Sequence, residues 1–214
     1  ADSILYLCTS TGGIWRRGSA FKSVTGTVYN DPNNNGTQDP GELPYQGAIV
    51  SAQPLSSYST TSANGGYSIY AEAFNDTVRV TALTPYAIVM PPYYLVTEDA
   101  DSLNFSIYTI PNIVDLCITV THTEPVRPGF NNSFVITVKN VGTTTASGLV
   151  RMGLPDGITY DWASPLPDQI LNDTLYWDVV NLQPGAFVNY AVNVSASATL
   201  TLGSTISYAA EVQP

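Results

Sequence analysis

Hydrophobic and polar residues alternate with a period of two along much of this chain, and helical spacing is hard to find. Residues 78–82 place Val, Val and Ala on one face and Arg and Thr on the other, and residues 134–139 repeat the pattern. Such alternation is typical of half-buried β-strands. It predicts strands near 24–30, 47–53, 66–71, 77–83, 103–109, 114–122, 133–140, 146–153, 174–180, 186–195 and 204–212.

Turn-forming sequences separate these stretches. They are Asn64-Gly65-Gly66, Pro128-Gly129, Asp156-Gly157 and Gln183-Pro184-Gly185. Many short strands with turn signals at this spacing favour β-sandwiches. We therefore predict an all-β fold made of two tandem β-sandwich domains.

A length of 214 residues suits two domains of ordinary size. The proline-bearing stretch "YTIPNIVD" (108–115) is the best boundary, which predicts domains at 23–110 and 111–214. Residues 1–22 form an N-terminal extension outside both. Its segment "SILYLC" resembles a strand without a hairpin partner and is followed by the Gly-rich "TSTGG". Such a strand needs a sheet edge, either in its own domain or in another copy of the chain.

Composition narrows the functional classes. Only 11% of the residues are charged, 44% are hydrophobic, and the formal net charge is −10. We expect no nucleic-acid binding, because a basic surface is needed to replace phosphate counterions. No apolar run approaches the roughly 20 residues that span a bilayer, so we expect no membrane insertion. The start at Ala1, without Met, fits an extracellular protein whose secretory signal has been removed, although an artificial start would look the same.

The few basic residues are unevenly spread. Arg16, Arg17 and Lys22 lie in a stretch without acids, whereas the chain from Asp31 onward is strongly acidic. Two interpretations are open: ordinary exposed charges near a terminus, or a basic segment that docks on an acidic body, its own or a neighbour's.

Two cysteines, Cys8 and Cys117, both lie in apolar strand-like runs. They could form a disulfide within one chain or between chains, or remain buried thiols.

The segment "NDPNNNGTQDPGE" (30–42) matches the calcium-loop pattern D-x-[DN]-x-[DN]-G-x5-E without a gap. Gly36 would permit the sharp turn at position six. The oxygen ligands would come from Asp31, Asn33, Asn35, Thr37 (by its backbone carbonyl), Asp39 and Glu42. Three carboxylates predict a modest affinity and a Ca²⁺ ion that stiffens the loop without acting as a sensor. The alternative is an Asn- and Pro-rich turn that carries acids by chance.

The first domain resembles a known family. "GTVYNDPNNNGTQDPGELPYQGAIVSAQ", with "TTSANGGYSIYA" and "DTVRVTAL", is similar to the calcium-binding B-type repeat of bacterial Sdr surface adhesins. The match covers roughly residues 24–83. It implies a prealbumin-like β-sandwich in which a strand precedes the metal loop and calcium stiffens a stalk. Some relatives hold extra calcium sites, for which "TEDAD" (97–101) is a candidate, but a solvated acidic turn explains this stretch better.

The second domain resembles the immunoglobulin-like DUF11 repeats of bacterial surface proteins. The resemblance rests on "DLCITVTHTEPVRPGFNNSFVITVKNVGTT", "LPDGITY", "LYWDVVNLQPGAFVNYAVNV" and "ISYAAEV". It implies a spacer or assembly module without a shared catalytic site.

The residues predict no enzyme and no catalytic residues. His122 is the only histidine, and no nucleophile motif such as G-x-S-x-G accompanies it. Zinc would need several His or Cys ligands. Asp156 and Asp161 could be imagined as a glycosidase pair, but turn roles explain both better.

Aromatic residues and sequons suggest surface roles. Trp177 is expected in a core, and Trp15 beside two arginines at an interface. Exposed rings also raise the alternative of sugar binding. Asn35 carries a glycosylation acceptor sequence but is better used on the metal. The other acceptor sequences predict glycosylation at Asn75, Asn104, Asn131, Asn172 and Asn193.

These observations together predict an extracellular structural protein whose copies assemble head to tail into a surface fibre or stalk. The strand "SILYLC" would add to a sheet edge of the next subunit. The predicted interface residues are Ile4, Leu5, Tyr6, Leu7, Trp15, Arg16 and Arg17. The main alternative is an adhesin, or a carbohydrate- or surface-binding fragment of a longer secreted protein. A hydrolase is a third and weaker alternative.

Overall fold

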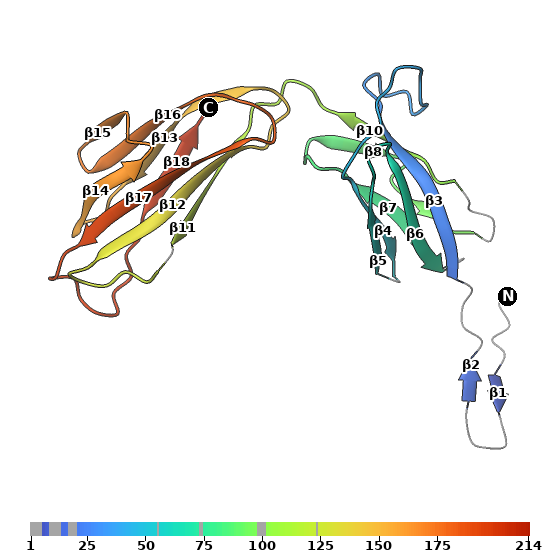
Figure 1. Cartoon of the computed structure of the whole chain (residues 1–214), viewed down its shortest axis with the longest axis horizontal. Helices are drawn as coiled ribbons and strands as arrows, with labels where there is room; N and C mark the ends of the chain where they lie inside the picture. Colours follow the sequence, from blue (N-terminus) through green and yellow to red (C-terminus); the bar gives the residue numbers. More distant parts are fainter. Residues whose placement is uncertain are drawn as a thin grey trace. The chain divides into compact units, whose positions relative to one another are not determined.

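The structure of the chain is a computed structural model that describes residues 6–8, 14–16, 21–54, 56–72, 75–97, 102–122 and 124–214. Every regular element in these residues is a β-strand, which confirms the predicted all-β fold (Figure 1). The chain divides into two compact units, Ala1–Thr109 (unit 1) and Ile110–Pro214 (unit 2). Each unit is described by itself.

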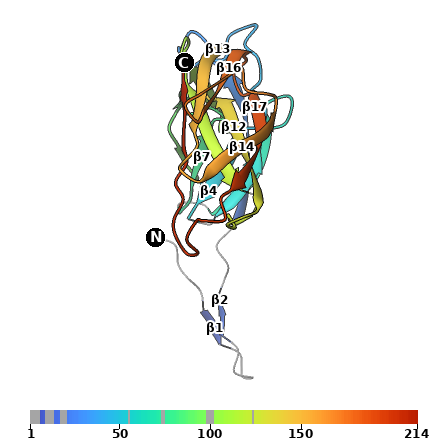
Figure 2. The same ribbon diagram turned by 90° about the vertical axis from the view of Figure 1, so that its left-hand side faces the viewer.

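Unit 1 contains a small hairpin and two four-stranded sheets. The hairpin pairs β1 (Tyr6–Cys8) with β2 (Ile14–Arg16) in a sheet of their own (Figures 1 and 2). Sheet I has the order β6-β3-β10-β8, and sheet II has the order β5-β4-β7-β9. Their strands are β3 (Phe21–Asn30), β4 (Ile49–Gln53), β5 (Ser57–Thr60), β6 (Gly66–Glu72), β7 (Thr77–Thr81), β8 (Ala87–Met90), β9 (Tyr94–Leu95) and β10 (Phe105–Thr109).

The core of unit 1 lies between sheets I and II. Alternate residues of each strand point inward, so valines and alanines of β3, β4, β6 and β7 meet the aromatic rings of β6, β9 and β10. Phe105 is fully buried, and its ring contacts Tyr94 edge-on at 5.0 Å between centroids. The Tyr67 hydroxyl is also buried and donates a hydrogen bond of 2.6 Å to the carbonyl of Leu103. This bond removes the cost of burying the hydroxyl.

Unit 2 is a β-sandwich of immunoglobulin-like, all-β character. Sheet III has the order β11-β12-β17-β14, and sheet IV has the order β15-β16-β13-β18. Their strands are β11 (Leu116–His122), β12 (Asn131–Asn140), β13 (Ala146–Gly153), β14 (Ile158–Ser164), β15 (Gln169–Leu171), β16 (Thr174–Leu182), β17 (Phe187–Ala196) and β18 (Ala209–Gln213).

Trp177 is the centre of the second core, as the sequence predicted. Its ring packs against Tyr190 of the opposite sheet at 5.0 Å, and its indole N–H donates to the carbonyl of Pro165. The inward positions of β12 are Phe134, Ile136 and Val138, which confirms the alternation expected there. Burial of these large side chains supplies the main favourable contribution to folding.

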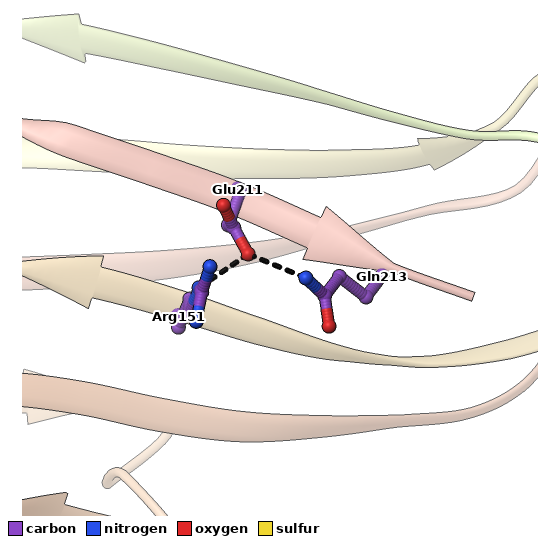
Figure 3. A network of polar contacts seen from close by, with 3 residues as sticks. All are labelled: Arg151, Glu211 and Gln213. Atoms are coloured by element: carbon purple, nitrogen blue, oxygen red, sulfur yellow. Dashed lines mark hydrogen bonds and ion pairs between the residues drawn. The ribbon is translucent and has the colours of Figure 1, made fainter.

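Charged contacts contribute little to this fold. One ion pair is found among the described residues, between Arg151 of β13 and Glu211 of β18, with Gln213 donating to the same carboxylate (Figure 3). Both partners of the ion pair are largely exposed, and surface ion pairs stabilise proteins only weakly. Apolar packing and backbone hydrogen bonds therefore hold the two sheets of unit 2.

The structure corrects several expectations about the strands. The segment "SILYLC" was expected to lack a hairpin partner, but β1 pairs with β2, with Leu7 opposite Trp15. The alternation also missed strands at sheet edges, namely β5, β8, β9, β14 and β15. The strands β5, β8, β9 and β15 have only two to four residues each, too few to show the alternation, and a register shift breaks the period of two in β14.

The Phe105→Ala substitution should lower the free energy of unfolding of unit 1 by about 3–5 kcal/mol, because it leaves a cavity where the ring met Tyr94 and Tyr67. Urea denaturation followed by tyrosine fluorescence measures the loss. Phe187→Ala is the matched control, since that ring is 62% exposed. Equal losses in the two variants would contradict the assigned core.

Alkaline solution should destabilise unit 1 through Tyr67. Burial raises the pKa of the Tyr67 phenol well above its ordinary value, and Tyr94 adds a smaller effect. The unfolded chain therefore releases the Tyr67 proton near pH 10 while the folded chain retains it, and the free energy of unfolding falls as the pH rises above about 10. The contribution is fully present below that pH.

The test is the pH dependence of unfolding in Tyr67→Phe, which should lose less stability than the wild type above about pH 10. Tyr70→Phe is the control, because Tyr70 is 65% exposed and lies outside the core. Parallel pH profiles for the two variants would show that Tyr67 is not the responsible group.

Candidate metal centre

The loop 31–42 leaves the end of β3 and returns to run beside the same strand. The N–H of Asn30 donates to the carbonyl of Leu43 at 2.8 Å, and the N–H of Tyr45 donates to the carbonyl of Val28 at 2.9 Å. The side-chain amide of Asn30 adds a bond of 3.1 Å to the Leu43 carbonyl. Both ends of the loop are therefore fixed to the sandwich, which explains how strands can enclose a loop of this type.

Asp31 is the anchor of the loop. It is fully buried, and its two carboxylate oxygens accept the backbone N–H groups of Asn35 at 3.1 Å and Gly36 at 2.7 Å. Burial acts to raise the pKa of Asp31, but the hydrogen bonds from Gly36, Asn35 and Ser106 outweigh it, so the pKa lies below its ordinary value. The carboxylate therefore remains negative in the folded protein.

The turn that Asp31 closes depends on Gly36. This residue has a φ of 73°, in the left-handed region that favours glycine. Its carbonyl accepts the Tyr29 hydroxyl at 3.1 Å. Asn34 also has a positive φ, of 57°, which asparagine tolerates better than most residues. The sequence predicted this turn from position six of the motif.

Three further predicted ligands, Asn33, Asn35 and Asp39, are joined by side-chain hydrogen bonds within the loop. The amide groups of Asn33 and Asn35 both donate to one carboxylate oxygen of Asp39, at 2.9 and 2.8 Å. The carbonyl oxygens of the two side chains accept the N–H groups of Asn35 and Thr37. Amide hydrogens thus supply the positive charge density around Asp39 in this structure.

Glu42 has an unusual half-satisfied carboxylate. Its Oε2 accepts the N–H of Asp39 at 3.0 Å, whereas its Oε1 is buried and has no hydrogen-bond partner among the described residues. An unpaired buried carboxylate oxygen costs free energy. It marks a position at which a positively charged ligand would be favourable.

Asp31 and Glu42 both act on the phenol of Tyr29. Burial raises the pKa of the Tyr29 phenol, and the negative charges of Asp31 and Glu42 raise it further. The fold therefore brings both carboxylates near the same phenol, although eleven positions separate them in the sequence. Among the described residues, however, no group of three or more His, Cys, Asp and Glu side chains is gathered around one point.

The donor set fits a hard cation such as Ca²⁺. It consists of carboxylate oxygens, amide oxygens and the Thr37 carbonyl, which are the ligands that calcium prefers. The amides of Asn33 and Asn35 would have to present oxygen in place of their N–H groups. The turn at Gly36 is thus already formed, and Oε1 of Glu42 has no partner among the described residues. The side-chain amides of Asn33 and Asn35 donate to Asp39.

The predicted interface residues lie in or near the β1–β2 hairpin. Tyr6 and Leu7 belong to β1, and Trp15 and Arg16 belong to β2. Ile4, Leu5 and Arg17 lie outside the described residues, as do residues 98–101 of the acidic stretch "TEDAD".

The two cysteines belong to different units. Cys117 has a free, exposed thiol on β11, an edge strand of sheet III. Cys8 belongs to β1, whose side chains are not described. The predicted pairing of these cysteines stays a prediction.

The predicted glycosylation sites differ in accessibility. Asn75, Asn104, Asn131 and Asn172 are exposed, and Asn193 is half-buried on the central strand β17. Asn172 lies in the turn between β15 and β16 with a φ of 47°.

His122 lies at a hollow that the sequence did not predict. The hollow is lined by the end of β11, residues 124–128 and residues 200–208. The imidazole packs against the rings of Phe134 and Tyr208, at 5.6 and 5.3 Å. The Tyr208 hydroxyl is buried without a hydrogen-bond partner among the described residues. A ring cluster of this kind has no local sequence signal, because its members come from three distant segments.

Comparisons with known proteins give no family for this chain: no protein-family model matches it, and a search of curated proteins finds no significant match. Among the described residues, no helix is long and apolar enough to cross a membrane.

Proposed function

We propose that this protein is an extracellular structural subunit whose copies assemble into a surface fibre or stalk, and that Ca²⁺ bound by loop 31–42 stiffens unit 1. The observation that carries the proposal is the half-satisfied carboxylate of Glu42, buried in a loop whose other oxygen donors match a calcium motif. A carboxylate oxygen buried without a partner is costly, so it is expected where a ligand compensates for it.

The residues that would hold the ion are Asp31, Asn33, Asn35, Asp39 and Glu42, by their side-chain oxygens, and Thr37, by its backbone carbonyl. A bound ion would supply positive charge that replaces the amide hydrogens now facing Asp39. The loop would then resist bending, which suits a mechanical role and needs no chemical reaction.

The hairpin at the N-terminus supports assembly by strand addition. Its strands β1 and β2 form a sheet with no further strand among the described residues. An isolated two-stranded sheet is marginally stable in water, and it gains backbone hydrogen bonds by joining a sheet edge. Strand exchange of this kind between successive copies does not close on itself and generates a filament. Trp15, Arg16 and Arg17 would lie at the junction between subunits.

The Glu42→Gln substitution should raise the melting temperature in chelator and reduce the additional stabilisation that calcium gives. In chelator, the neutral side chain removes the negative charge from a group whose Oε1 is buried without a partner, so the melting temperature should rise. In millimolar calcium, the variant should gain less than the wild type, which we expect to be stabilised by about 2 kcal/mol at tens-fold saturation.

Differential scanning calorimetry in calcium and in chelator measures both effects. Glu124→Gln is the control, because this substitution removes the same charge from an exposed position in unit 2. Equal melting temperatures of the wild type in calcium and in chelator would refute the metal site.

Removal of residues 1–13 should abolish long polymers while both units remain folded, because the strand that joins successive copies is lost. Electron microscopy and sedimentation velocity measure the outcome. A chain in which a Gly/Ser segment of equal length replaces residues 1–13 is the control for bulk at the terminus, and it should also stay monomeric. Long polymers from either variant would refute strand addition.

A further inference from the structure

The outer face of sheet II carries a row of side chains that crosses β5, β4 and β7 and ends at Tyr93, the residue before β9. Backbone register places Tyr58 of β5 opposite Ser51 of β4, and Ser51 opposite Arg79 of β7. Tyr93 precedes β9, and the Arg79 guanidinium lies over its ring at 4.9 Å from the centroid. Residues opposite each other on antiparallel strands share a face of the sheet. The row Tyr58–Ser51–Arg79–Tyr93 therefore lies on one face.

This face points away from the core. The residues that flank the row along the strands, Val50, Ala52, Val78 and Val80, are all buried. Tyr58 and Tyr93 are 66% and 48% exposed. The row spans three strand spacings, or about 14 Å. Tyr58 accepts a hydrogen bond of 3.1 Å from the Gln53 side chain, which orients its ring on the sheet. Ser51 has a small side chain, so the surface is lower between Tyr58 and Arg79 than at either residue.

The strands of sheet II lack acidic residues, unlike the chain as a whole. The protein has 17 acidic and 7 basic residues, yet β4, β5, β7 and β9 contain no Asp or Glu. Arg79 is the one basic residue in these strands, and among the described residues no carboxylate lies within ion-pair distance of it. The Tyr93 ring covers one face of the guanidinium, and the N–H groups at its edge remain available for a planar anion.

We propose that the outer face of sheet II binds an acidic polysaccharide. The Arg79 guanidinium would pair with the carboxylate of a uronic acid, and the rings of Tyr58 and Tyr93 would contact sugar rings on either side of it. Arginine matches carboxylate geometry with two parallel hydrogen bonds. Exposed tyrosines offer an apolar ring together with a polar hydroxyl, and a sugar presents both kinds of surface. This binding adds an attachment function to the proposed fibre and requires neither calcium nor assembly.

The probe is sodium hyaluronate, in which every second sugar is a uronic acid, compared with the same polymer after chemical reduction of its carboxylates. Isothermal titration calorimetry of the full chain at low ionic strength measures binding. The wild type should bind the carboxylated polymer, with an affinity that falls as salt is added, and should not bind the reduced polymer.

Variants locate the site. Arg79→Gln should weaken binding about tenfold, because it removes a charged hydrogen bond, and Tyr58→Ser should also weaken it. Lys139→Gln is the control for charge, and Tyr70→Ser is the control for loss of an exposed tyrosine; neither should change the affinity. Circular dichroism checks that each variant is folded.

Three results would overturn the proposal. The first is that the wild type binds both polysaccharides equally or binds neither. The second is that Arg79→Gln and Lys139→Gln change the affinity for hyaluronate by the same amount. The third is that the chain binds no polysaccharide and Arg79→Gln loses self-association. The last result would show that a second copy covers this face. Failure of the calcium test or of the fibre-assembly test would leave the polysaccharide proposal standing, because those tests use Glu42 and residues 1–13 and not the row on sheet II.

Discussion

A carboxylate shielded from water must find hydrogen-bond donors within the protein, and at Asp31 this requirement determines the shape of the candidate site. Both oxygens of Asp31 are satisfied by N–H groups of the following turn, so the chain must fold back on itself at Gly36. That turn brings Asn33 and Asn35 to Asp39 and directs Glu42 inward. The ends of the loop then close against β3. One buried negative charge therefore organises twelve residues that contain no regular secondary structure.

The alternation of apolar and polar residues was sufficient to predict the all-β class and the long central strands. It worked for β12 and β13 because both have one face in the core along their whole length. It failed for β14, where the register shifts between Tyr160 and Trp162 and breaks the period of two. It also failed for β8 and β9, which are short and flank the two prolines of "MPPYY".

The motif spacing predicted which residues form the loop, because calcium loops require oxygen donors at fixed positions. It could not predict their surroundings. Ser106 reaches Asp31 only because β10 pairs in parallel with β3, and this pairing joins segments far apart in the sequence. The orphaned oxygen of Glu42 likewise depends on how the loop packs. The row on sheet II required the register of four strands, and no local pattern in the sequence specifies such a register.

The placement of basic residues has a consequence for resistance to proteolysis. Among the Lys and Arg residues in the described part of the chain, Arg127 alone lies outside a strand; Arg16, Lys22, Arg79, Lys139 and Arg151 all belong to β2, β3, β7, β12 and β13. Trypsin-like endopeptidases cut after these two residue types and need an extended, locally unfolded substrate segment, which a residue hydrogen-bonded in a sheet does not offer. Arg127 lies in the loop between β11 and β12 of unit 2, and Pro128 follows it, which gives a type of bond that such enzymes do not cut. Among the described residues, the two folded sandwiches would therefore offer these enzymes no readily cleaved bond.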